Sequence, residues 1–139
     1  MRAERDHYTA ALREANDALP GEDISNELAQ LEERIGKIFD YVEKHPEKAG
    51  EIRRFMCYYL PTTLKLVSAY REFDAHDTGS ADIARSKAEI ITALGMINQA
   101  FDKLMVKLMQ DAALDVSTDI AALQTILAQE GLAGRQMFE

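Results

Sequence analysis

Two runs of apolar residues, spaced alternately four and three positions apart, constrain the fold of this chain more than any other feature. The first run lies in residues 24–42 and the second in residues 90–108. Such a repeat keeps the apolar side chains on one side of an α-helix that packs almost parallel to its neighbour. The members are Ile24, Leu28, Leu31, Ile35, Ile38 and Val42, and then Ile90, Leu94, Ile97, Phe101, Leu104 and Leu108. Both segments are therefore predicted to be long helices of a bundle.

A less regular apolar stripe lies between these two runs and contains Pro61. Its members are Ile52, Phe55, Met56, Tyr59, Leu60, Leu64, Val67, Tyr70 and Phe73. Pro46, just before the stripe, suits the first turn of a helix. Pro61 lacks a backbone N–H, and its ring presses against the carbonyl of Cys57. Because the apolar spacing continues past Pro61, we expect one kinked helix rather than two. The kink leaves backbone carbonyls without a helical hydrogen bond. These carbonyls could be used in the function of the protein, or they could accept hydrogen bonds from Thr62, Thr63 or water.

Shorter helices are predicted at both ends of the chain. The N-terminal segment carries Tyr8, Leu12, Ala15 and Leu19 at helical spacing. A separate C-terminal helix is expected from about Ser117, after a turn at Asp115–Ser117. This helix should end at Gly131, with Leu132 folded back in a Schellman cap.

Short reversals should make the bundle antiparallel. The segment Asp74–Gly79 is predicted to turn the chain, and Ser80 suits the N-cap of the next helix. No segment alternates apolar and polar residues as a half-buried strand does. We therefore expect an all-α fold, formed by an antiparallel bundle of about three long helices with a kink at Pro61. Shorter N- and C-terminal helices complete it, and residues 1–139 form a single domain.

The charge and the cysteine content limit which kinds of binding partner and which cellular compartment are expected. The chain has 16 Lys and Arg against 24 Asp and Glu, a net charge of −8. Because a nucleic-acid binder needs a basic surface, we expect no nucleic-acid partner. The longest uncharged stretch, Ile90–Phe101, has twelve residues. A membrane span needs about 20, so we expect no membrane insertion. With Cys57 alone, no internal disulfide can form, which favours the cytoplasm.

No familiar catalytic or metal-binding motif is present in the sequence. Cys57 is not followed six positions later by the Arg of a phosphatase loop, and we expect it to pack as a small hydrophobe. The histidines are scattered at positions 7, 45 and 76. Asp74, His76 and Asp77 look like a solvated turn, and the turn expected at Asp115 separates the aspartates at 111, 115 and 119. We therefore expect no metal site and no cofactor.

Aromatic and cationic side chains occur together around Pro61, namely Phe55, Tyr58, Tyr59 and Tyr70 with Arg53, Arg54 and Lys65. An exposed tyrosine beside an arginine is typical of an interaction hot spot. Alternatively, the tyrosine rings pack at the rim of the bundle with their hydroxyl groups in water. The candidate partner-binding residues are Arg53, Arg54, Tyr58, Tyr59 and Lys65.

The same segment carries a family resemblance. Residues 52–66 read IRRFMCYYLPTTLKL and resemble the signature iRkFlnYYLPttlKLl of the XpaC-like family, which is named for 5-bromo-4-chloroindolyl phosphate hydrolysis. Met56 and Cys57 stand where Leu and Asn are usual. The resemblance covers about residues 35–132, and its other blocks are Lys37–Asp40, Ala100–Leu104, Leu114–Ile120 and Glu130–Leu132.

The resemblance implies phosphate-ester hydrolysis by name, but it supplies no catalytic residue to transfer to this chain. It also implies an association with toxic-anion (tellurite) resistance proteins of the TelA kind. Many members carry hydrophobic segments upstream of this helical region. The chain is accordingly expected in the cytoplasm, or as the soluble part of a membrane-anchored protein.

Three functions remain open at this point. We favour a non-catalytic interaction module that binds a TelA-like protein through the segment around Pro61. The first alternative is a phosphate monoester hydrolase, in which Arg53 or Arg54 and Lys65 would clamp the phosphate. Asp115 or Asp119 would then hold a metal or act as base. The second alternative is a coiled-coil dimerisation unit, since intermolecular coiled coils and intramolecular hairpins share one seam pattern.

Overall fold

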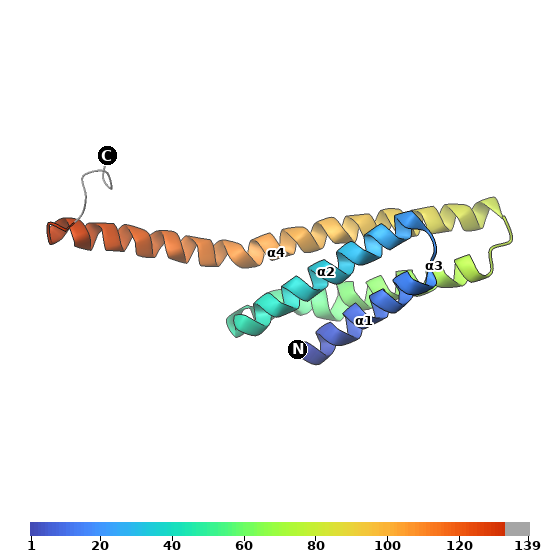
Figure 1. The fold of residues 1–139 in the computed structure, drawn as a ribbon, viewed down its shortest axis with the longest axis horizontal. Helices are drawn as coiled ribbons and strands as arrows, with labels where there is room; N and C mark the ends of the chain where they lie inside the picture. The colour runs from blue at the N-terminus through green and yellow to red at the C-terminus, as the bar shows by residue number, and fades with distance from the viewer. Residues whose placement is uncertain (133–139) are drawn as a thin grey trace. The chain divides into compact units, whose positions relative to one another are not determined.

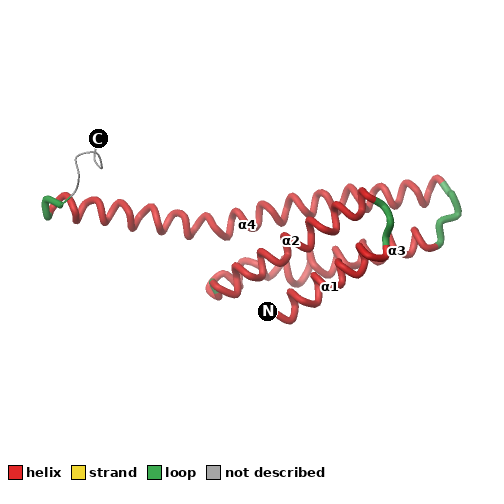
Figure 2. Tube along the Cα trace, in the orientation of Figure 1, coloured by secondary structure: helices red, strands yellow, loops and turns green. Residues whose placement is uncertain are grey.

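A computed structural model describes residues 1–132 of the chain, and all the regular structure in this range is helical (Figures 1 and 2). The all-α prediction is therefore confirmed. The elements are α1 (Arg2–Ala18), α2 (Glu22–Lys44), the 3₁₀-helix η1 (Pro46–Ile52), the π-helix η2 (Phe55–Tyr59), α3 (Leu60–Ala75) and α4 (Ala81–Gln129). The chain divides into two compact units, residues 1–105 and 106–139.

The core of the first unit is built on α2. All six apolar residues of its predicted seam are buried, together with Phe39 beside them. Leu12, Ala15 and Leu19 from the N-terminal segment are also buried, as their spacing predicts. Helix α1 packs against α2 and α3, and Figure 1 shows α1, α2 and α3 reversing direction in turn. The predicted antiparallel packing follows from burying these seams against one another.

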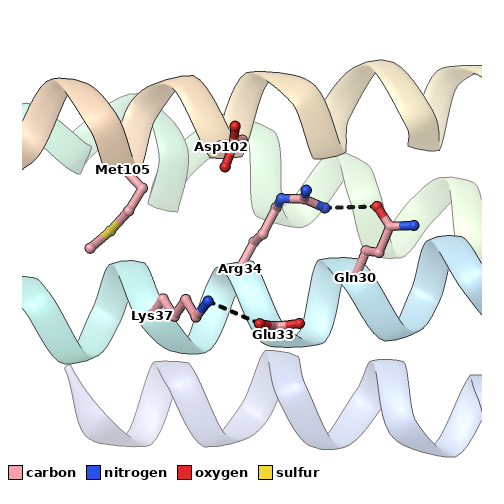
Figure 3. Close-up of a pocket in the computed structure, with 6 residues that line it drawn as sticks. All are labelled: Gln30, Glu33, Arg34, Lys37, Asp102 and Met105. Atoms are coloured by element: carbon pink, nitrogen blue, oxygen red, sulfur yellow. Dashed lines mark hydrogen bonds and ion pairs between the residues drawn. The ribbon is translucent and has the colours of Figure 1, made fainter.

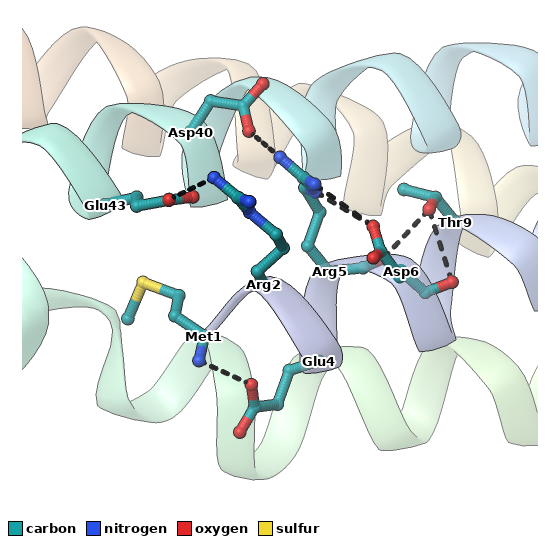
Figure 4. A network of polar contacts seen from close by, with 8 residues as sticks. All are labelled: Met1, Arg2, Glu4, Arg5, Asp6, Thr9, Asp40 and Glu43. Atoms are coloured by element: carbon teal, nitrogen blue, oxygen red, sulfur yellow. Dashed lines mark hydrogen bonds and ion pairs between the residues drawn. The ribbon is translucent and has the colours of Figure 1, made fainter.

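Ion pairs line the contact between α1 and α2 (Figure 4). Arg2 Nη2 lies 2.8 Å from Glu43 Oε1, and Arg13 Nε donates to Glu32 Oε1 at 2.9 Å. Arg5 pairs with Asp40 of α2, and this bond raises the pKa of Arg5. These groups are exposed or half-buried, so each pair adds little to the free energy of unfolding. We infer that the pairs mainly select which face of α1 packs against α2.

A π-helical turn replaces the simple kink expected at Pro61. In η2 the N–H of Leu60 donates to the carbonyl of Phe55, five residues earlier. This wider turn takes up one extra residue just before Pro61, which has no N–H to donate. As a result the apolar stripe changes phase by one position. After Phe55 the buried residues are Leu60, Thr63, Val67 and Tyr70.

The phase change corrects two predictions. Tyr59 lies in the apolar stripe by its spacing, but its side chain is 38% exposed. Cys57 was expected to pack as a small hydrophobe and is exposed. Thr63 is buried, and its Oγ1 donates to the carbonyl of Tyr59 at 2.6 Å, as expected for a threonine near the distortion.

The reversal between α3 and α4 forms as predicted. Gly79 has φ +77° and donates its N–H to Asp77 Oδ1 at 2.8 Å. Ser80 caps α4 by accepting the N–H of Asp82 at 3.2 Å. Across the reversal, Lys87 Nζ lies 3.0 Å from Asp74 Oδ1 and 3.6 Å from Asp77 Oδ2. These contacts tie the start of α4 to the end of α3.

The prediction of a turn at Asp115–Ser117 and a separate helix after it is wrong. Helix α4 runs unbroken to Gln129. No Gly or Pro occurs between Gly95 and Gly131 to interrupt it, and the hydroxyl of Thr118 bonds back to the carbonyl of Leu114 at 3.0 Å instead of capping a new helix. Within residues 1–132, no helix has the length and apolar character needed to cross a bilayer.

The Schellman cap at the end of α4 is confirmed. Gly131 adopts φ +70°. The N–H of Leu132 donates to the carbonyl of Leu127 at 2.8 Å, and that of Gly131 donates to Ala128 at 3.1 Å. These are the two bonds that define this cap.

The Lys87 contacts predict a pH-dependent contribution to stability. The hydrogen bond to Asp74 raises the pKa of Lys87 above its ordinary 10.5. Folding therefore favours the ammonium form, and the gain is complete below pH 10.5 and is lost as the pH rises through the folded pKa. We expect Lys87→Gln to lower the free energy of unfolding by about 0.5–1 kcal/mol near neutral pH.

Urea denaturation over a range of pH values measures this difference. It should stay constant from about pH 7 to pH 9 and shrink above pH 10.5. Arg85→Gln, which removes an exposed cation from the same helix, is the matched control. A difference that stays the same above pH 10.5 would contradict the assignment.

Candidate partner-binding surface and a polar pocket

A chain of aromatic rings connects the core of the first unit to its surface beside η2. The centroid of the Phe55 ring lies 5.5 Å from that of Phe39 and 4.8 Å from that of Phe101. The Tyr59 ring contacts Phe101 edge to face at 6.5 Å, and the Tyr58 ring contacts Tyr59 at 5.5 Å. The three phenylalanines are buried, whereas Tyr58 is 60% exposed. The outermost ring is therefore held in place by rings that are fixed in the core.

Arg54, Tyr58 and Tyr59 line an open hollow of about 460 Å³ on this surface, called here the aromatic hollow. These are three of the five candidate residues. Arg53 and Lys65 are also exposed, but they are not among the lining residues. The π-helical turn produces this arrangement, because its extra residue moves Tyr59 out of the buried stripe and next to Tyr58. No signal in the residue spacing indicates that shift.

A second, more enclosed pocket lies between α2 and α4 within the first unit (Figure 3). It has a volume of about 240 Å³. Arg34 Nη1 donates to Gln30 Oε1 at 2.9 Å, and Lys37 Nζ lies 2.9 Å from Glu33 Oε1. The bond from Lys37 lowers the pKa of Glu33. The lining residues are Gln30, Glu33, Arg34 and Lys37 from α2 and Asp102 and Met105 from α4.

Buried Asn98 joins this pocket to the core. Its Nδ2 donates to the carbonyl of Glu27 at 3.1 Å and to Glu27 Oε2 at 2.6 Å, and its Oδ1 accepts from Arg34 Nη1 at 3.2 Å. The network links α2 to α4 through the buried amide of Asn98 and the half-buried side chains of Glu27 and Arg34. Asn98 was absent from the sequence-based candidates. The signal that could reveal it is the 4-3 spacing of Leu94, Asn98 and Phe101, which are all buried.

The charges of this pocket are matched within the protein. Arg34 and Lys37 supply two positive charges, and Glu33 and Asp102 supply two negative ones. The two cations already donate to protein acceptors. We therefore interpret the pocket as a polar connection between two helices rather than as a binding site for a charged ligand.

The residues of the hydrolase alternative lie in different units. Arg53, Arg54 and Lys65 belong to residues 1–105, and Asp115 and Asp119 belong to residues 106–139. The unbroken helix leaves Asp111, Asp115 and Asp119 at intervals of four positions. Among the residues that the structure describes, no three His, Cys, Asp or Glu side chains are grouped so as to hold a metal ion.

One comparison with known proteins gives a match. A family model described as 5-bromo-4-chloroindolyl phosphate hydrolysis protein matches residues 12–123, a range that includes the aromatic hollow and the polar pocket. No curated protein and no solved structure matches the chain.

The Asn98 network predicts a loss of stability when the amide of Asn98 is replaced by a carboxylate. Asn98→Asp would place a second carboxylate against Glu27 Oε2, which accepts from Asn98 at 2.6 Å. We expect the variant to lose about 2–4 kcal/mol of unfolding free energy at about pH 7.

Urea denaturation at neutral pH tests this prediction. Gln99→Glu adds one carboxylate at the neighbouring exposed position and should change stability by less than about 0.5 kcal/mol. Equal losses for the two variants would show that Asn98 is not a buried link between α2 and α4.

Proposed function

We propose that this chain, which belongs to the family described as 5-bromo-4-chloroindolyl phosphate hydrolysis protein, is a helical module that binds a protein partner through the aromatic hollow. The observation that carries the proposal is the position of Tyr58. Tyr58 is 60% exposed, yet its ring contacts the ring of Tyr59. The Tyr59 ring in turn contacts the ring of buried Phe101. An exposed aromatic ring that is already ordered loses little conformational entropy when a partner covers it.

The composition of the hollow supports the same function. Tyrosine and arginine are enriched among the residues that contribute most to protein–protein binding. Arg54 lies beside the two tyrosine rings and can donate to carboxylates or stack on aromatic groups of a partner. The hollow would thus combine apolar area with directional hydrogen bonding.

Charge indicates which kind of partner surface fits. Residues 51–76 carry Arg53, Arg54, Lys65 and Arg71 against Glu51, Glu72 and Asp74. This stretch is therefore slightly positive within a chain of net charge −8. In the described part of the chain, no ion pair engages Arg53, Arg54 or Lys65. An acidic patch on the partner would complement these cations.

A TelA-like protein is the partner that we propose to test first. The XpaC-like resemblance of residues 52–66 connects such helical regions with toxic-anion resistance proteins of this kind. We place the interaction in the cytoplasm and assign the module no catalytic role of its own.

The description of the family supports a second candidate, hydrolysis of a phosphate monoester. In that case Arg53 or Arg54 and Lys65 would bind the phosphate through charge-assisted hydrogen bonds. Assaying the purified chain on 5-bromo-4-chloroindolyl phosphate, with and without divalent metal ions, distinguishes the two functions. Turnover that survives repurification and is lost in Lys65→Gln would favour the hydrolase.

Binding to a purified TelA-like protein should depend on the aromatic hollow. We expect Tyr58→Ala and Arg54→Glu each to weaken binding by about 10- to 100-fold, measured by isothermal titration calorimetry. Both side chains are exposed, so circular dichroism should show an intact fold.

Matched controls on α4 separate the hollow from general surface effects. Met96→Ala removes a side chain that is 67% exposed, and Arg85→Glu reverses an exposed charge. Both should leave the affinity within about 2-fold of the original. Unchanged binding by the Tyr58 and Arg54 variants would exclude the hollow as the partner site.

A further inference from the structure

The helical part of the second unit carries an exposed apolar seam, called here the C-terminal seam. Its positions alternate in steps of three and four. Unlike the seams of residues 24–42 and 90–108, it has no buried member. Ile120 is 51% exposed and Leu123 is 53% exposed. The members are Val106, Met109, Ala113, Val116, Ile120, Leu123 and Leu127.

We infer that the C-terminal seam is the interface of a parallel two-stranded coiled coil with a second copy of this chain. The seam covers three heptads, the shortest length at which a repeat of this kind argues for a coiled coil. Val106, Ala113, Ile120 and Leu127 occupy the a positions, and Met109, Val116 and Leu123 occupy the d positions. A β-branched residue at a followed by leucine at d, as in Ile120 and Leu123, favours two strands.

The flanking positions argue for an identical partner. The e positions hold Gln110, Ser117 and Gln124, and the g positions hold Ala112, Asp119 and Ile126. Asp119 is therefore the one charged residue among the a, d, e and g positions of residues 106–127. A second copy of the seam therefore brings no row of like charges against the first. The apolar surfaces of two copies can match each other about a two-fold axis.

Asp119 also sets the direction of pairing. In a parallel pair, each g residue faces the e residue of the next heptad on the partner. Asp119 then faces Gln124 of the second copy, whose amide can donate to the carboxylate. In an antiparallel pair that aligns the two seams, the Asp119 carboxylates would come close together near the centre and repel each other. The parallel arrangement avoids this repulsion.

This inference rests on the second unit and is independent of the function proposed for the aromatic hollow. A chain could bind its partner through the hollow as a monomer or as a dimer. The two experiments can therefore fail separately.

Sedimentation equilibrium of the full chain tests the dimer. We expect a mass close to twice the 15.6 kDa of one chain. Ile120→Asp should raise the dimer dissociation constant by at least about 100-fold, because it buries two carboxylates at one layer of the interface. Thr118→Asp adds the same charge at an exposed f position and should leave the dimer intact.

Each alternative outcome overturns the inference. A monomeric wild-type chain would show that the seam has another occupant, such as an apolar helix of a different protein. A dimer that survives Ile120→Asp would place the interface elsewhere. Equal effects of Ile120→Asp and Thr118→Asp would show that the seam does not carry the association.

Cross-linking tests the direction without disrupting the seam. In a Cys57→Ser background, Leu123→Cys should form an intermolecular disulfide on incubation with oxidised glutathione, because a parallel coiled coil places the two d positions opposite each other. Thr118→Cys should form none. Absence of the Leu123→Cys disulfide in a dimeric sample would rule out the parallel arrangement.

Discussion

Burial of the α2 seam is the interaction on which the rest of the first unit depends. Its six members and Phe39 have almost no contact with water, and the other helices of this unit are arranged around them. Helix α1 covers α2 with its own apolar face, while salt bridges such as Arg2–Glu43 lie along the contact. Asn98 adds a polar link from α4 to α2. Apolar burial thus supplies the driving force, and the polar contacts select the register in which the helices meet.

One extra residue in the turn before Pro61 connects this core to the proposed function. Without it, Tyr59 would remain in the buried stripe of α3 as its spacing suggests. The π-helical turn instead moves Tyr59 outward against Tyr58, while Phe55 stays buried against Phe101. π-Helical turns are frequent at functional sites because they displace side chains without breaking the helix. Here the turn orders an exposed aromatic pair beside Arg54.

Apolar seams of the same spacing have two different outcomes in this chain. The seam of α2 is buried inside the bundle, whereas the C-terminal seam is exposed along the second unit. The spacing is the same because both are stripes on one side of a helix. The number of elements that cover a stripe decides whether it becomes core or remains available for another chain. A hydrophobic seam without a cover is the expected sign of an interface.

The helical class, the seam of α2, the Ser80 cap and the Schellman cap could be predicted from the sequence. They depend on residue spacing and on contacts between near neighbours in the chain. The position of Tyr59, the burial of Asn98 and the unbroken course of α4 could not. Whether the turn before Pro61 widens, and whether Asn98 or Ile97 faces the core, depends on how α2, α3 and α4 meet. Local propensities at Asp115–Ser117 suggested a cap, but the helix continues because nothing in the backbone there interrupts it.

The sequence by itself therefore determined which elements form. The tertiary structure decided which side chains reach the surface, because packing between helices sets the phase of each buried stripe.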